Sequence, residues 1–197
     1  MGRPKGYERD TVLDAAMELF WLKGFEATTT RELVDHLGLN RNSLYTEFGS
    51  KRGLYDAALR HYERRWLDRN LGPLERAEAR LEDIEGLFHH YVSVARRTGT
   101  QKGCMMANSI VELAPVDVVA KQGAHRFLER ARTAFQNALE NGRAAGELRS
   151  SVDSRTEAAF FASTWLGMLV LLRAGSPAET LESVADRAVS YGRSLAA

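Results

Sequence analysis

Apolar residues recur at spacings of three and four along almost the whole chain, and this is the period of an amphipathic helix. No segment shows the sustained alternation of apolar and polar residues that is typical of a β-strand. The four prolines, Pro4, Pro73, Pro115 and Pro177, stand where helices can begin or end. The pattern therefore predicts an all-α protein.

The periodicity predicts about nine helices. We expect the fourth to run from about Lys51 to Arg69, to end before Gly72 and Pro73, and to connect the two halves of the chain. The expected ranges are 9–23, 28–37, 41–47 and 51–69 in the first part, and 75–97, 103–113, 116–141, 154–174 and 178–195 in the second.

The most informative segment is residues 28–51, TTTRELVDHLGLNRNSLYTEFGSK, which predicts two short helices joined by a tight turn. The first ends at Gly38, because the left-handed backbone is least costly for glycine. Asn40 is placed to cap the second, which should span about Arg41 to Glu47. The outward residues of that second helix are Arg41, Asn42, Ser43, Thr46 and Glu47. A short helix with a hydrogen-bonding outer face suits insertion into a DNA major groove.

Residues 9–60 resemble the DNA-binding domain of TetR/AcrR-type transcriptional regulators. The matching segments are LFWLKGFEATTTREL (19–33), GLNRNSLYTEFGSK (38–51) and LYDAAL (54–59). Gly49 departs from the family pattern, where proline is common, and Asn42 stands where a small residue is frequent. The resemblance implies an N-terminal three-helix helix-turn-helix DNA-binding domain at residues 1–60. It also implies a C-terminal helical ligand-binding and dimerisation domain at residues 61–197.

The resemblance also implies which residues meet DNA. Arg can bind guanine bidentately, Asn can bind adenine, and the Thr methyl group can contact thymine. Tyr45 and Lys51 match family positions that contact phosphates, and the amides opened by Thr28 and Thr29 suit a phosphate. The predicted DNA-binding residues are Thr28, Thr29, Arg31, Arg41, Asn42, Ser43, Tyr45, Thr46 and Lys51. Arg3 in the leading arm suits the minor groove, and a solubilising tail is the open alternative.

The second part of the chain is rich in aromatic and methionine residues, which serve either as core or as the walls of a pocket for a small apolar or aromatic ligand. The predicted pocket residues are Phe88, Tyr91, Cys104, Met105, Asn108, Phe127 and Trp165. The apolar run 158–172 predicts a dimer interface formed by the last two helices, because it is more apolar than one buried face requires. The predicted interface residues are Phe161, Trp165, Met168 and Leu172.

Composition narrows the function further. The chain has 197 residues, a net charge of +1 and one cysteine, so no internal disulfide framework can form. The run 158–172 is shorter than a membrane span requires, and no signal peptide can be read in the polar start of the chain, so we expect a cytoplasmic protein. The spacing of the histidines supports no metal site, and no phosphate loop or catalytic set indicates a cofactor or an enzyme.

The sequence thus predicts a homodimeric transcriptional repressor that binds a palindromic DNA operator and is released by a small-molecule ligand. A regulator that responds to oxidants or electrophiles through Cys104 is the alternative, although a lone cysteine is most often a small buried hydrophobe. An all-helical enzyme is the competing reading from another class.

Overall fold

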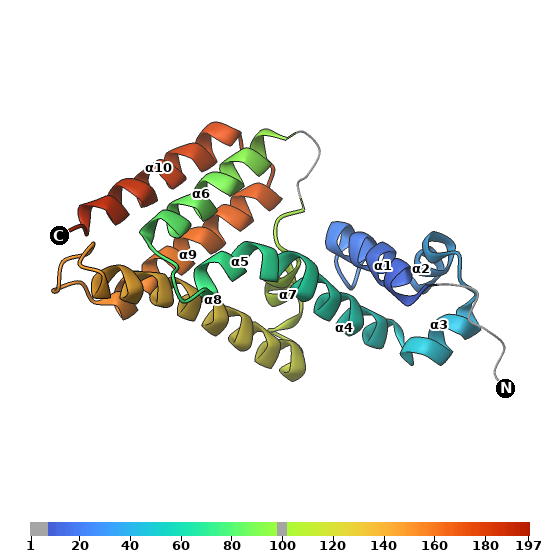
Figure 1. The fold of residues 1–197 in the computed structure, drawn as a ribbon. Coiled ribbons are helices and arrows are strands. Elements are labelled where there is room, and N and C mark those ends of the chain that lie inside the picture. Colours follow the sequence, from blue (N-terminus) through green and yellow to red (C-terminus); the bar gives the residue numbers. More distant parts are fainter. Residues whose placement is uncertain (1–7, 98–101) are drawn as a thin grey trace. The chain divides into compact units, whose positions relative to one another are not determined.

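The computed structural model describes residues 8–97 and 102–197 (Figure 1). Its regular elements in those ranges are all helices, and the prediction of an all-α fold is confirmed. None of the helices in the described part of the chain is both long and apolar enough to cross a bilayer. The chain divides into two compact units between Trp66 and Leu67, later on the same helical run than the predicted boundary at residue 60.

The first unit contains α1 (Arg9–Lys23), α2 (Thr30–Leu37), α3 (Arg41–Phe48) and α4 (Lys51–Tyr62). Helix α1 packs against α4 and α2, and α3 packs against α4. The ring of Tyr55 on α4 lies with its centroid 5.0 Å from that of Phe20 on α1 and 5.0 Å from that of Phe25. These aromatic contacts join α1 to α4, and the buried Leu44 anchors α3, so Arg41, Asn42 and Thr46 are left exposed.

Local capping interactions set the ends of the short helices. The Oδ1 atom of Asn40 accepts a hydrogen bond from the Ser43 amide at 2.8 Å, so the prediction that Asn40 caps the helix that became α3 is confirmed. Gly38 has a φ of 62°, the left-handed conformation that the sequence predicts for the turn. Ser50 caps α4 by accepting from the Gly53 amide at 3.0 Å. The helix-turn-helix is therefore specified by residues inside the motif itself.

Helix α4 continues without a break through a π-helical turn (Glu63–Leu67) into α5 (Asp68–Glu75). The predicted end before Gly72 and Pro73 is wrong, because α5 includes both residues. Tertiary contacts hold this last part in helical form: Leu71 and Leu74 are buried. The side-chain amide of Asn137 donates to the Leu74 carbonyl at 2.8 Å, which satisfies a carbonyl at the helix end.

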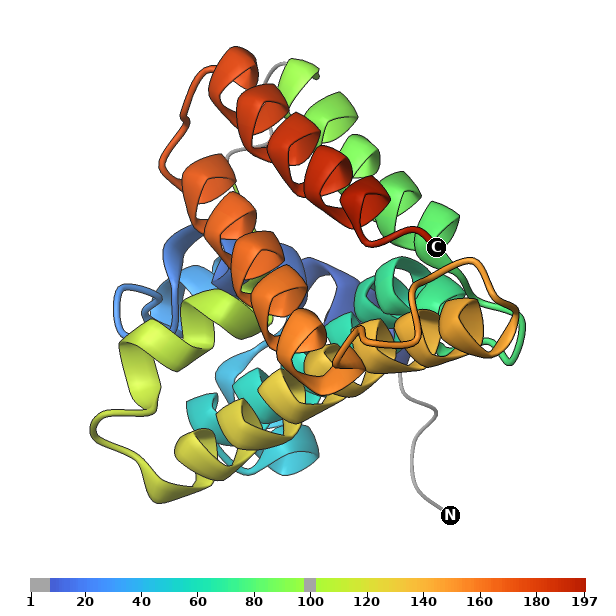
Figure 2. The same cartoon turned by 90° about the vertical axis from the view of Figure 1, so that its left-hand side faces the viewer.

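The second unit contains α5 and five further helices, and α6 and α10 lie side by side in both views (Figures 1 and 2). The further helices are α6 (Leu81–Arg96), α7 (Met105–Leu113), α8 (Val118–Ala144), α9 (Ser154–Arg173) and α10 (Ala178–Ser194). Helix α8 packs against α9, α5 and α7. With residues 51–75 counted as one run, the described ranges contain nine helical segments, as the periodicity predicts.

Candidate nucleic-acid interface and ligand pocket

The outer face of α3 is polar and open to solvent. Arg41, Asn42 and Thr46 are exposed, and Ser43 is half-buried beside them. The Arg41 guanidinium lies 5.5 Å from the centre of the Tyr45 ring, a cation–π contact, and Arg41 remains exposed. Side chains of this kind, presented by a helix whose other face is fixed, can reach the edges of bases in a major groove. Their contact with DNA stays a prediction.

The start of α2 is closed by a capping box. Thr29 Oγ1 accepts from the Glu32 amide at 3.2 Å, and Glu32 Oε2 accepts from the Thr29 amide at 2.9 Å. Hydrogen bonds from Lys23 and then from Thr29 lower the pKa of Glu32 to about 2. The sequence analysis missed Glu32, although the spacing of Thr29 and Glu32 is the signature of this motif. The carboxylate occupies part of the amide surface that was predicted for a phosphate.

The prediction that Thr28 contacts DNA is wrong. Its side chain is fully buried, and its hydroxyl donates to the Gly24 carbonyl at 2.6 Å. Its amide donates to the Phe25 carbonyl at 3.3 Å, and its carbonyl accepts from Lys51 Nζ at 2.8 Å. Thr28 is therefore a structural residue that holds the turn before α2 in place, and the helix itself begins two residues later.

Lys51, the first residue of α4, contacts the segment between α1 and α2. Besides its bond to the Thr28 carbonyl, its ammonium lies 4.2 Å from the centre of the Phe25 ring. Tyr45 on α3 has its hydroxyl 3.5 Å from the Thr30 hydroxyl of α2, and this contact, followed by the Arg41 contact, lowers the pKa of Tyr45. Of the two predicted phosphate contacts, Tyr45 thus touches α2 at Thr30, and Lys51 touches the turn before α2. Arg31 on α2 is almost fully exposed.

An ion pair on α3 was also missed. Glu47 was expected on the outward polar face, and its carboxylate lies 3.2 Å from Arg9 Nε at the start of α1. The Arg9 guanidinium also lies 5.8 Å from the centre of the Phe48 ring. Glu47 is thereby neutralised next to the surface predicted to face phosphates. The leading arm with Arg3 lies outside the described residues.

The seven predicted pocket residues belong mainly to a packed core. Phe88, Tyr91, Cys104, Met105, Phe127 and Trp165 are all buried. The Trp165 ring centroid lies 6.2 Å from that of Tyr91 and 6.0 Å from that of Phe127. Burial, and after it the neighbouring Cys104, raises the pKa of Tyr91. Asn108 uses its side-chain amide to donate to the Lys102 carbonyl at 2.9 Å.

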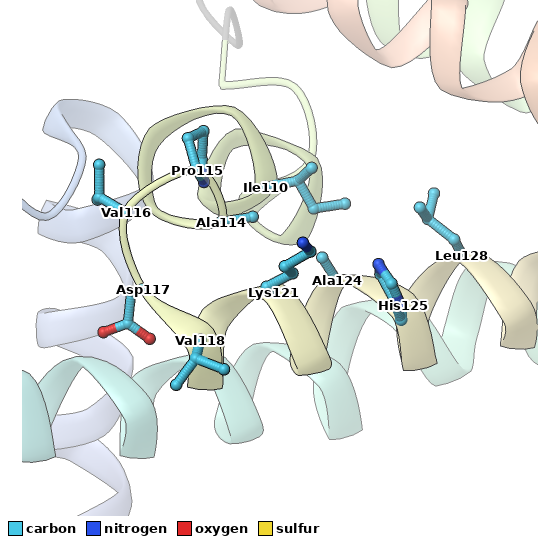
Figure 3. Close-up of a pocket in the computed structure, with 10 residues that line it drawn as sticks. All are labelled: Ile110, Ala114, Pro115, Val116, Asp117, Val118, Lys121, Ala124, His125 and Leu128. Carbon is cyan, nitrogen blue, oxygen red and sulfur yellow. The ribbon is translucent and has the colours of Figure 1, made fainter.

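A pocket of about 620 Å³ lies instead between α7 and α8, at the turn that joins them (Figure 3). It is lined by Ile110, Ala114, Pro115, Val116, Asp117, Val118, Lys121, Ala124, His125 and Leu128. None of the seven predicted pocket residues is among them. Lys121 and His125 rise from α8 toward α7, whereas Asp117 points away from the space between the two helices. Among the residues that the structure describes, no cluster of His, Cys, Asp and Glu could hold a metal ion.

The predicted dimer residues need correction. Phe161, Trp165, Met168 and Leu172 are buried within a single copy of the chain, with at most 6% of each side chain exposed. Their spacing of four, three and four marks the face of α9 that packs inward, which the periodicity alone could not distinguish from an interface. The other face of α9 carries exposed apolar and small residues: Phe160, Ser163, Gly167 and Val170.

Comparison with known protein families places both units. Residues 12–58 match the family model of bacterial regulatory proteins of the tetR family, and residues 79–188 match that of the tetracyclin repressor-like C-terminal domain. The chain belongs to the TetR family. It is therefore a DNA-binding transcriptional regulator of the helix-turn-helix type. The helical run of residues 51–75 joins the two regions that the TetR-family models match.

TetR-family relatives align over nearly the whole chain. The HTH-type transcriptional repressor ComR of Escherichia coli (strain K12) is 33% identical over 93% of this chain and 88% of ComR. The uncharacterised HTH-type regulator YezE of Bacillus subtilis (strain 168) is 29% identical over 96% of this chain and 98% of YezE. A solved cysteine mutant of the TetR-family regulator CifR, complexed with 26-bp double-strand operator DNA, has a TM-score of 0.85. It is 27% identical and covers 96% of this chain and 98% of CifR.

Proposed function

We propose that this protein is a homodimeric repressor that binds a palindromic operator and leaves it when a small molecule binds the second unit. The observation that carries the proposal is the exposed polar face of α3, presented by a helix-turn-helix whose caps and core are complete. The repressor activity of the relative ComR and the operator complex of CifR support it. A protein with this role acts in the cytoplasm, where its operator lies.

In the proposed complex α3 enters the major groove. Arg41, Asn42 and Thr46 read base edges, because all three are exposed on the same short helix. Five further residues bind the phosphates around these bases and thereby fix the register of the protein on DNA: Thr29, Arg31, Ser43, Tyr45 and Lys51. Thr29 takes part through the amides of the first turn of α2, and Glu32 leaves room for fewer phosphate oxygens than an uncapped helix would.

The proposed dimer uses the outward face of α9 together with α10, in a four-helix packing with the second copy. Phe160 is 42% exposed and Val170 is 57% exposed, so both would be covered by a two-fold partner. Ser163 and Gly167 between them are small and would let two helices approach closely. Two recognition helices related by this two-fold would meet half-sites about one helical turn, or ~34 Å, apart.

Release of DNA requires that the second unit favours two arrangements to different degrees when a ligand is bound. The helical run of residues 51–75 is the candidate for carrying that change, because it belongs to both units. In the second unit Arg130 of α8 binds Asp68 at 2.7 Å and Glu75 at 2.6 Å, at the two ends of α5. Any ligand that shifts α8 would therefore act on α5 through this arginine.

Sensing through Cys104 is the less favoured alternative. The thiol is 98% buried at the start of α7, next to the buried Met105. A sensor cysteine needs a thiolate that reagents can reach, and an apolar site disfavours the thiolate. The burial of Cys104 therefore supports a packing role.

The decisive experiment is a gel shift with DNA from upstream of the gene itself, followed by selection of binding sites from random sequence. We expect a palindromic consensus for the wild type. Asn42→Ala and Thr46→Ala should each relax the preference at one position per half-site, at a cost of about 1–3 kcal/mol for each lost base contact. Gln122→Ala, which removes an exposed amide from the second unit, is the matched control. An unchanged consensus for both α3 variants would refute the assignment of α3 to the groove.

A further inference from the structure

Five of the seven exposed large apolar residues described in the second unit lie on α7, on α8 or in the turn between them, and the other two, Phe160 and Val170, lie on α9. Val116 is 82% exposed and Val111 is 75% exposed, the two highest fractions for large apolar side chains in the described ranges. Val118, Val119 and Leu128 complete the group on α8. Single exposed apolar residues need no explanation, but a contiguous set beside a pocket marks a surface that binds something.

Small side chains create the pocket at this turn. Ala114 at the end of α7 and Ala124 on α8 leave space where larger residues would fill the gap between the two helices (Figure 3). Ile110 and Leu128 form apolar walls on either side of that space. A volume of about 620 Å³ lies within the range of sites that hold a small organic molecule.

The lining carries two basic side chains and one acidic side chain. Lys121 and His125 stand one helical turn apart on α8 and both line the pocket, and neither forms an ion pair with any described residue. Arg130 on the same helix, in contrast, binds two carboxylates. The one acidic residue of the lining, Asp117, accepts from the Ala120 amide at 2.7 Å as the N-cap of α8. Lys121 and His125 are both exposed, and because Asp117 points away from the space between the helices they can pair with a ligand that brings the opposite charge.

We propose that this pocket binds an amphipathic organic acid, with its carboxylate at Lys121 and His125 and its alkyl or aryl body against Ile110, Ala124 and Leu128. The inference rests on the proposed function, because it gives the chemical class of the ligand that releases the repressor. It places that ligand at the turn between α7 and α8 and outside the aromatic core around Trp165. The aryl or alkyl body of the ligand buries apolar surface, and its carboxylate distinguishes it from neutral or cationic molecules with the same body.

Isothermal titration of the full-length protein without DNA tests the class of ligand. The probes are phenylbutyrate, phenylbutanol and phenylbutylamine, which share one apolar body and differ in charge. We expect phenylbutyrate to bind about twofold to fivefold more tightly than the alcohol, and the amine to bind least, as one solvated ion pair allows. Equal binding of acid and alcohol, or no binding of the acid at millimolar concentration, would overturn the proposal.

Three variants locate the site. Lys121→Gln should remove the preference for the acid over the alcohol, and Ala114→Leu should weaken both by filling the pocket. Arg126→Gln, which removes an exposed cation from α8 outside the lining, should leave the titration unchanged. Full acid binding by Ala114→Leu would place the ligand elsewhere and overturn the assignment. If a second copy of the chain covers this surface instead, Ala114→Leu should lose self-association and the wild type should bind no acid. That result would also overturn the proposal.

The gel shift separates this inference from the proposed function. Operator binding by the ligand-free protein depends on the first unit and on dimerisation and on no residue of the pocket lining, so it would persist if the pocket bound no acid. Release of the operator by phenylbutyrate from the wild type, but not from Lys121→Gln, would link the two. Acid binding without any operator binding would support the proposed ligand site and refute the proposed repressor function.

Discussion

Lys51 offers the sharpest test of the DNA-binding unit, because two roles can be measured separately. The substitution Lys51→Met keeps most of the apolar stem and removes the ammonium. Two interactions are lost: the 2.8 Å hydrogen bond to the Thr28 carbonyl and the contact with the Phe25 ring at 4.2 Å. The first leaves a carbonyl of the turn without its charged donor, and the second removes a cation from an aromatic face.

The magnitudes follow from the exposure of the lysine. A hydrogen bond from a charged group contributes about 1.5–3 kcal/mol, and the lower end applies because Lys51 is only half-buried. A cation–π contact at such a site contributes about 0.5–1 kcal/mol, part of which the methionine sulfur retains. We therefore expect Lys51→Met to lower the free energy of unfolding of the first unit by about 1–2 kcal/mol.

Urea unfolding followed by tryptophan fluorescence measures this loss, since Trp21 and Trp66 report on the first unit. Lys23→Met is the matched control: it removes an ammonium from the more exposed pair with Glu32 and should destabilise by less than Lys51→Met does. Operator binding is then measured against salt concentration under conditions where both variants are folded. Lys51→Met should bind all sequences more weakly and lower the salt slope by about one unit per protomer.

Two results would refute this reasoning. Wild-type stability for Lys51→Met would mean that the bridge to the Thr28 carbonyl does not hold the turn. An unchanged salt slope would mean that Lys51 meets no phosphate and serves only within the protein. Lys51→Arg, which keeps the charge, should restore most of the salt slope and thereby separates charge from local geometry.

Three further outcomes are expected. Val170→Glu should sediment as a folded monomer, because Val170 lies on the proposed dimer face. Leu172→Glu should unfold, because its charge would be buried within one copy of the chain. A fully dimeric Val170→Glu protein would place the interface elsewhere. Because the pKa of Glu32 falls from 4.5 to about 2 on folding, its stabilisation is complete above pH 4.5 and is lost as pH falls toward 2. Glu32→Gln should flatten that acid limb of the unfolding curve, and identical limbs would contradict the capping box. Cys104→Ser should lower stability slightly, and peroxide should leave both forms bound to operator; selective release of the wild type would make redox sensing primary.

The helix-turn-helix could be predicted from the sequence because its determinants are local. The cap at Asn40 and the left-handed Gly38 act within a few residues, so spacing alone identified them. Thr28 was misassigned for the opposite reason. Its side chain is fully buried and its carbonyl accepts from Lys51, twenty-three residues away along the chain, and no local pattern reports either feature.

In the second unit the predictions depended on which face of a helix points inward. Helix α9 is apolar around most of its circumference, so its periodicity gave the buried stripe and not the exposed one that holds Phe160 and Val170. Pro73 was expected to end a helix, and packing of Leu71 and Leu74 overrode that local signal. The pocket between α7 and α8 depends on space left by small residues, such as Ala114 and Ala124, which sequence patterns do not register.

The π-helical turn at Glu63–Leu67 determines what the deletion of one residue would do to the helical run of residues 51–75. A π turn holds one more residue than an α turn, and one residue corresponds to about 100° of rotation in an α-helix. Tyr55 and Tyr62 before the turn, and Leu71 and Leu74 after it, can therefore each face their own core although no single α-helical phase need serve both. A one-residue deletion within the turn would convert it into regular α-helix and leave the residues on either side facing as before, whereas the same deletion within α4 or α5 would turn the residues after it by about 100°. The π turn is therefore the place in residues 51–75 where one residue can be lost while Leu71 and Leu74 keep facing their core.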